Sequence, residues 1–358
     1  MRHAAGPVAV SLAVITAAAT LALAQSPKAP PPPPAKDPAA LSEHTALLAP
    51  IQVDSLTLTP IVATGPAAAG AATDEQLLVL DEAMAARQVK IREIADGNVN
   101  SLTFVNQAAH PVFVMAGEVI IGGKQDRIIG RNTVIPANTT QEVPVYCVEH
   151  GRWTGETKEF TTARALAHGR LRGQASYAAQ QDVWNEVAAK NKVRKTETAS
   201  GTYRKVAQQQ SDGTLAAMEK QVDAALAKLP AADRGRMIGY AVALNGAVAT
   251  VDMFGSPALF KKLETKLVRS YLTEAVDIAA RKDAKPPTPA DVKSFMADAD
   301  KAVEQKSYDT SAAETVINSG MHASKAKVGY KPRKAASDAA TAPAAAAEPT
   351  VYQNYQAK

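Results

Sequence analysis

Short apolar runs separated by turn residues dominate residues 99–149 of the sequence. Leu102–Asn106 and Pro111–Met115 are two of these runs, and both contain the β-branched and aromatic residues that strands prefer. Runs of about five to eight residues with turns at this spacing are typical of an antiparallel sandwich or barrel. The pattern therefore predicts a β-rich segment over about 48–155.

Helical spacing of apolar positions replaces this pattern over residues 161–230. The clearest helix begins at Asp212, a favourable capping residue, and ends at Pro230, which a helix cannot continue through. The apolar residues between them recur at intervals that place them on one helix face: Leu215, Met218, Val222, Leu226 and Leu229.

Two further apolar runs, Met237–Leu244 and Ala247–Phe254, are joined by the dipeptide Asn245-Gly246. Asn-Gly in this setting is a strong hairpin signal, because a type I′ turn needs positive φ at both of its central residues. We therefore predict a hairpin over 236–254, followed by a helix over 257–280 that packs on the small-residue face of the hairpin.

These patterns together predict an α+β protein. An antiparallel, β-sandwich-like sheet comprises about residues 50–150 and the 236–254 hairpin, and several α-helices pack against it. We assign 48–331 to a single domain with four parts: β-rich (48–155), helical (161–230), hairpin and helix (236–280) and C-terminal (288–331).

Two segments of biased composition flank this domain. Residues 25–47 contain a run of prolines and are predicted to form a Pro-rich linker. Residues 332–358 include an Ala-rich tract and are predicted to be a disordered tail, because such a composition buries too little apolar surface to become ordered.

The first 24 residues have the pattern of a secretory signal peptide. Arg2 and His3 precede an apolar run, and Ala22-Leu23-Ala24 supplies small residues at its end. We expect cleavage after Ala24. The alternative is an uncleaved anchor, because the run approaches the length that spans a bilayer. Both predict an extracytoplasmic protein, periplasmic or secreted, with no transmembrane span beyond the leader.

The 358-residue chain has a formal net charge of +5, and the excess of positive charge is local. Residues 164–205 contain nine Lys and Arg residues against three acidic ones. Such a segment can attract an anionic ligand, although a charge run on a helix is more often a solvated face. It lacks the regular interleaving of stacking aromatics that single-strand binders use, so we expect no specific nucleic-acid binding.

No cofactor or metal is predicted. The single cysteine and the six histidines form neither a zinc-binding pair nor a His-Glu-x-x-His motif. Gly117–Lys124 has the glycine spacing of a phosphate loop, but Gly123 stands at the lysine position and neither Lys124 nor Gln125 after it supplies the magnesium-binding hydroxyl.

The segment 117–153 is the candidate site, because short apolar runs alternate there with charged residues. Its carboxylates Glu118 and Glu149 are candidate catalytic groups, since a carboxylate near apolar surface gains a pKa suited to acid–base catalysis. We expect them to converge with two guanidiniums in one concavity when the strands pair. The alternative is a network of Arg–Glu pairs that only fixes the bends.

The candidate ligand-binding residues of the same segment are Gln125, Arg127, Arg152 and Trp153. Guanidiniums bind phosphate or carboxylate groups with two hydrogen bonds, which suits them to an anionic ligand. Cys147 is expected to be a buried and inert thiol, because His150 lies three positions on and projects to the opposite strand face.

Parts of this segment and of the later chain resemble a known family, named as the domain associated with ADP-ribosylglycohydrolases and rhodanese-phosphatases (ARPP). The similar stretches are Gly117-Glu118, Gly123–Arg127, Val143–Trp153, the Asn245-Gly246 hairpin, Asp252–Ser256 and Arg269–Tyr271. The resemblance covers about residues 51–328. It implies a link to ADP-ribose or nucleotide metabolism that rests on domain fusions.

Two hypotheses about function follow. In the first, an exported domain binds an anionic or phosphorylated ligand, similar to ADP-ribose or a nucleotide, and hydrolyses it if Glu118 or Glu149 acts as a base. In the second, the domain is a non-catalytic extracytoplasmic scaffold or protein-interaction domain. Both hypotheses leave four points open: enzyme activity, ligand identity, oligomeric state and protein partners.

Overall fold

The structure is a computed structural model that describes residues 39–65, 77–94, 100–154, 157, 159–177, 179–302, 304–310, 313–331 and 350–358. The chain divides into two compact units, Met1–Ala35 and Lys36–Lys358, and every described residue belongs to the second. The predicted leader, 1–24, therefore lies outside the described residues. Within the described part, none of the helices combines the length and apolar character needed to cross a bilayer.

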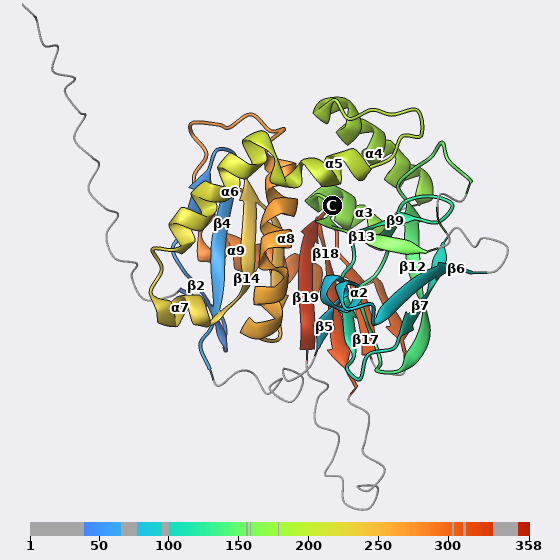
Figure 1. Ribbon diagram of the computed structural model, residues 1–358. Helices are drawn as coiled ribbons and strands as arrows, with labels where there is room; N and C mark the ends of the chain where they lie inside the picture. The colour runs from blue at the N-terminus through green and yellow to red at the C-terminus, as the bar shows by residue number, and fades with distance from the viewer. Residues whose placement is uncertain are drawn as a thin grey trace, which may run out of the picture. The chain divides into compact units, whose positions relative to one another are not determined.

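The larger sheet of the second unit is antiparallel and contains ten strands (Figure 1). These are β1 (Ala39–Ser42), β2 (Thr45–Leu47), β3 (Ile51–Val53), β4 (Leu56–Ala63), β14 (Met237–Leu244), β15 (Ala247–Phe254), β16 (Glu304–Asp309), β17 (Ala313–Ser319), β18 (Ala323–Tyr330) and β19 (Thr350–Ala357). Their spatial order is β1-β2-β4-β14-β15-β19-β18-β17-β16, and β3 pairs with β4 beside this path.

The predicted hairpin is confirmed as the pair β14 and β15. Its turn residues Asn245 and Gly246 have φ values of 47° and 85°, the positive values that a type I′ turn requires. The hairpin lies in the interior of the large sheet, because β14 also pairs with β4 and β15 also pairs with β19.

The prediction of a disordered tail over 332–358 is wrong for residues 350–357, which form β19. This strand pairs with β15 on one side and β18 on the other, and it buries Val351, Tyr352 and Tyr355. Burial of these apolar side chains and backbone pairing on both sides stabilise a strand that its composition alone does not predict.

The predicted linker, 25–47, is likewise wrong at its C-terminal end, where β1 and β2 form the edge of the large sheet. The strand β2 pairs with β4 and buries Ala46 and Leu47. Burial of these two side chains in the sheet makes this part of the segment ordered, whereas residues 25–38 lie outside the described part.

Two smaller sheets contain most of the predicted β-rich segment. The six-stranded sheet has the order β13 (Phe160–Leu166), β9 (Glu118–Gly122), β10 (Arg127–Ile129), β12 (Thr139–Cys147), β7 (Ser101–Asn106) and β6 (Val89–Glu93). It curls into a half-barrel, and an isolated bridge between Arg92 and Glu159 joins its two edges. The three-stranded sheet has the order β11 (Thr133–Ile135), β8 (Val112–Val114) and β5 (Leu78–Val79).

The α-helices that the structure describes are α2 (Leu80–Ala85), α3 (Gly169–Tyr177), α4 (Gln180–Arg194), α5 (Arg204–Gln208), α6 (Gly213–Leu226), α7 (Ala231–Gly235), α8 (Pro257–Ala275) and α9 (Pro289–Asp300). The α+β class is confirmed. The predicted helical part, 161–230, is wrong at its start, because residues up to Leu166 pair with β9 as strand β13.

The helix α8 connects the large sheet to the rest of the core. Pro257 at its first turn and the Ser256 hydroxyl, which accepts the Leu259 N–H at 3.1 Å, fix its start. Leu263 and Leu267 are buried in the largest apolar cluster, between this helix and the sheet. Figure 1 shows α6 and α8 on the same side of β4 and β14. Because α8 packs on β14 of the large sheet and on β13 of the half-barrel, it holds its polar side chains in fixed positions against these two sheets.

Candidate functional site

Four of the predicted site residues lie close together at one end of the half-barrel. Glu149 accepts hydrogen bonds from Arg152 Nη2 at 2.6 Å and from Arg152 Nε at 2.9 Å. Gln125 Nε2 donates to the Glu149 carbonyl at 2.7 Å, and Arg127 Nη1 lies 3.4 Å from Gln125 Oε1. Glu149 thus lies with both predicted guanidiniums, but the structure brings only this one of the two predicted carboxylates to the cluster, since Glu118 binds Met115 and Lys266. All four side chains of the cluster are engaged with one another.

Asp126, which was not among the predicted site residues, is the centre of this cluster. Its carboxylate is fully buried and accepts hydrogen bonds from Arg204 Nε and Nη2 at 2.9 and 2.8 Å, and from the Thr202 hydroxyl at 2.7 Å. Arg152 Nη2 approaches it at 3.4 Å, and the Gly122 N–H donates to it at 3.1 Å. The cluster therefore ties α5 to the half-barrel, and it has the form of the predicted structural alternative.

Glu149 has the properties of a structural carboxylate. Burial opposes its ionisation, yet the hydrogen bonds from Arg152, Ser200 and the Asp126 N–H outweigh burial and hold its pKa below the ordinary value. A carboxylate with a lowered pKa is a weak base at neutral pH. Its catalytic role stays a prediction.

Glu118 lies in a different environment, away from this cluster. It accepts hydrogen bonds from the Met115 N–H at 2.8 Å and from Lys266 Nζ at 2.6 Å, and the same ammonium lies 2.6 Å from Asp81 Oδ2. Burial raises the pKa of Glu118, and the Lys266 charge offsets only part of this increase. The two predicted catalytic carboxylates therefore have separate partners. Glu118 binds Lys266 of α8, whereas Glu149 belongs to the Asp126 cluster beside α5.

Arg127 is buried, whereas Trp153 is exposed. Arg127 is fully buried, and its Nη2 lies 4.0 Å from Glu93 Oε1, so in this conformation solvent does not reach the guanidinium. Trp153 is 48% exposed, with the Lys124 ammonium 5.2 Å from its ring centroid. The structure thus places the predicted ligand-binding residues on no common open surface.

Cys147 is a buried thiol, as the sequence predicts. Burial raises its pKa to about 11, with Arg127 opposing the increase and Glu93 adding to it. The group is therefore protonated at neutral pH, and a protonated thiol is a poor nucleophile.

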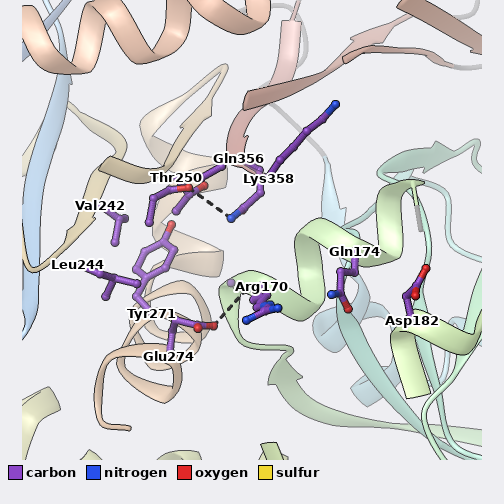
Figure 2. Close-up of a pocket in the computed structure, with 13 residues that line it drawn as sticks. Arg170, Gln174, Asp182, Val242, Leu244, Thr250, Tyr271, Glu274, Gln356 and Lys358 are labelled. Carbon is purple, nitrogen blue, oxygen red and sulfur yellow. Dashed lines mark hydrogen bonds between the residues drawn. The ribbon is translucent and has the colours of Figure 1, made fainter. Parts of the chain in front are cut away.

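A well-formed cavity lies elsewhere, between α3, the start of α4, the end of α8 and the strands β14, β15 and β19 (Figure 2). Its volume is about 710 Å³, which lies within the usual range for small-molecule sites. Arg170 and Gln174 line it from α3, one helical turn apart, and Tyr271 and Glu274 line it from α8. Asp182 lies at the side formed by α4.

Strand register explains the sheet side of the cavity. Val242 is opposite Thr250, and Thr250 is opposite Gln356, so three adjacent strands place one row of side chains on the same face. All three are buried, and they give this wall one apolar and two polar side chains. The strand β19, which was predicted to be disordered, thus supplies part of the cavity.

A buried polar network surrounds Asp252, which lies two residues after Thr250 on β15 and points to the same face of the sheet. Asp252 accepts hydrogen bonds from the hydroxyls of Tyr271 and Tyr352, from Arg172 Nη2 at 2.9 Å and from Asn354 Nδ2 at 2.9 Å. Burial opposes its ionisation, but Arg172 and the two hydroxyls outweigh burial and lower its pKa. Because the network joins α3, α8, β15 and β19, it holds the cavity walls together.

His168, directly before α3, is buried near the cavity. Its Nε2 lies 3.0 Å from Glu186 Oε1 and 4.0 Å from Glu274 Oε2, and its Nδ1 lies 2.8 Å from the Tyr203 hydroxyl. Burial lowers the pKa of His168 despite the two carboxylates, so the ring is neutral at neutral pH. Across the described ranges, no group of three or more His, Cys, Asp or Glu side chains could hold a metal ion.

Sequence reasoning missed the cavity because its residues come from distant segments. Two weak signals were present: Arg170 and Gln174 at a spacing of four within a helix, and Asp252 and Tyr271 within stretches that resemble the ARPP family. Neither signal brings the four residues together without the tertiary structure.

Comparison with known proteins gives one match. The model of the ARG and Rhodanese-Phosphatase-superfamily-associated Protein domain, ARPP-1, matches residues 44–337, a range that includes every cavity-lining element except β19. No curated protein and no solved structure matches the chain. ARPP-1 is a domain of unknown function. The resemblance found in the sequence is therefore confirmed, and the chain belongs to the ARPP-1 domain family.

Proposed function

We propose that this chain is a binding protein for a small polar molecule, which occupies the cavity between α3, α8 and the strands β14, β15 and β19. One observation carries the proposal: a cavity of about 710 Å³ is lined by polar side chains that five separate elements hold in place. Apolar walls with a few fixed polar groups are typical of small-molecule sites. Val242 and Leu244 provide the apolar part, whereas Thr250, Tyr271 and Glu274 provide polar groups.

The anionic ligand inferred from the sequence, similar to ADP-ribose or a nucleotide, is one candidate for this cavity. Its support is Arg170, whose side chain is 70% exposed at the cavity and makes an ion pair with Glu186 at 3.0 Å. The paired charges of Glu149, Arg152 and Asp126 instead support the second candidate function, a non-catalytic scaffold. We favour binding, because a scaffold does not require a polar cavity.

Filling the cavity tests the proposal. A Cβ atom at Gly169 would meet only Glu274 Oε2, at 3.9 Å, so Gly169→Leu is sterically tolerated at the backbone and projects into the cavity. We expect a ligand that raises the melting temperature of the wild type, in a panel of ADP-ribose, nucleotides, sugar phosphates, sugars and amines, to lose that effect in Gly169→Leu. Thermal-shift measurements at several ligand concentrations provide the comparison.

The matched control is Gly235→Leu, because a Cβ atom at Gly235 meets nothing within 4 Å and the residue does not line the cavity. This variant is expected to keep the ligand effect. If no compound of the panel shifts the melting temperature, or if both variants respond as the wild type does, the cavity is not the binding site and the scaffold is favoured.

We also propose that the protein acts outside the cytoplasm. The support is the sequence of the first 24 residues, with its basic start, apolar run and Ala-Leu-Ala end. Cell fractionation is expected to recover the protein from the periplasm or the medium. Recovery from the cytoplasm alone would contradict export.

A further inference from the structure

Carboxylates outnumber free cations around the cavity. Asp182 and Glu274 line it, and Glu186 lies beside it, bonded to Arg170 Nε at 3.0 Å. The ion pair with Glu186 largely neutralises the guanidinium of Arg170, which also lines the cavity. Two carboxylates, Asp182 and Glu274, therefore remain without a full positive counter-charge among the described residues.

The other cations nearby are directed elsewhere. Lys358 lines the cavity, but its ammonium donates to the Gly320 carbonyl at 2.7 Å, and its side chain runs away from Tyr271 and Glu274 (Figure 2). Lys190 and Arg194 both bind Asp277, at 3.0 and 3.3 Å. His168 is neutral because burial lowers its pKa.

The cavity also contains a buried acceptor without a partner among the described residues. The Gln174 Oε1 atom is buried and accepts no hydrogen bond, although Gln174 lines the cavity. The carboxylate of Glu274 accepts the Arg170 backbone N–H at 3.1 Å, and its Oε1 accepts nothing from the described residues. The Gln356 amide already donates to the Ala249 carbonyl at 3.3 Å. A ligand that brings donors would satisfy Gln174 Oε1, because a buried acceptor without a partner is costly, and it could also reach the partly exposed carboxylate of Glu274.

We infer that the ligand of this cavity carries a protonated amine, which binds Glu274 as a charge-assisted donor while other donors of the ligand reach Gln174 and Asp182. This inference rests on the proposed binding function and names its ligand class. An ammonium group supplies three donors and the positive charge that the two carboxylates lack. A phosphorylated ligand would instead bring negative charge toward both carboxylates and would be repelled by them.

Three sugars with the same ring separate charge from shape: glucosamine is cationic, glucose is neutral and glucose 6-phosphate is anionic. Isothermal titration calorimetry at pH 7 and low salt is expected to give the order glucosamine, glucose, glucose 6-phosphate from tightest to weakest. Glu274→Gln keeps the acceptor for the Arg170 N–H and removes the charge. It is expected to weaken glucosamine binding about tenfold and to leave glucose binding nearly unchanged.

The control is Glu197→Gln, which removes an exposed carboxylate that does not line the cavity and is expected to leave all three affinities unchanged. Binding of glucose 6-phosphate that exceeds that of glucosamine, or that strengthens in Glu274→Gln, would overturn the amine inference while leaving the cavity as a binding site. Equal loss of glucosamine and glucose binding in Glu274→Gln would also overturn it. If none of the three sugars binds, the inference is wrong, and the wider panel with Gly169→Leu then decides the proposed function separately.

Discussion

Replacement of Asp252 with alanine is expected to lower the free energy of unfolding by about 3–5 kcal/mol, because the change leaves a buried guanidinium without its counter-charge. Arg172 is only 5% exposed, and it bonds Asp252 through both Nη atoms. The hydroxyls of Tyr271 and Tyr352 lose their acceptor in the same variant. Since these partners belong to α3, α8 and β19, we expect the loss to be global.

Urea unfolding followed by circular dichroism measures this effect. Tyr352→Phe removes one donor and keeps the ion pair, so we expect about 1–2 kcal/mol for this variant. Asp309→Ala is the control, because Asp309 is largely exposed and pairs with Lys331 on the surface, where we expect about 0.5 kcal/mol or less. A loss for Asp252→Ala as small as that of the control would show that the network does not hold these elements together.

Lys266→Met is expected to have the second large effect, about 3–5 kcal/mol at neutral pH. The Lys266 ammonium lies between Glu118 and Asp81, at 2.6 Å from each, and both Lys266 and Glu118 are buried. Without the ammonium, Glu118 keeps only the Met115 N–H as a donor among these contacts. Its carboxylate must then bind a proton or remain charged in the core.

The effect of Lys266→Met is expected to depend on pH. The pKa of Glu118 is already raised in the folded protein, and loss of the Lys266 charge raises it further. Between the unfolded and folded pKa values the folded state binds more protons, so stability falls as pH rises through this window. We therefore expect the loss in Lys266→Met to be smaller at pH 5 than at pH 8.

Urea unfolding of the wild type and the variant at pH 5 and pH 8 tests this expectation. Lys262→Met on the same helix is the matched control, because Lys262 pairs with the exposed side chain of Glu82 and should give about 1 kcal/mol or less at both pH values. A loss for Lys266→Met that is independent of pH would contradict the account of Glu118.

Local sequence signals predicted the elements that local interactions stabilise. The hairpin β14–β15 follows from Asn245-Gly246, since the turn needs positive φ at both residues. The helix α6 follows from apolar spacing and from Pro230 beyond its end. In contrast, β19 depends on pairing with β15 and β18 and on the burial of Tyr352, and these partners lie far away in the sequence.

The candidate site was only partly predictable for the same reason. The charged residues that follow the apolar run of β12 were predicted to lie near one another, and Glu149 and Arg152, just beyond the strand, do meet. Alternation could not show that Arg204, from a helix beyond the half-barrel, closes the cluster by binding Asp126. The cavity needs α3, α8 and three strands at once, so its polar residues become neighbours only in the folded chain.

A crystal structure of the protein grown with glucosamine tests the central claim most directly. The account predicts electron density for the sugar in the cavity, with its ammonium within hydrogen-bond distance of Glu274 and its ring near Tyr271. Glucosamine bound instead beside Lys124 and Trp153, with the cavity empty, would contradict the claim that this cavity is the ligand site.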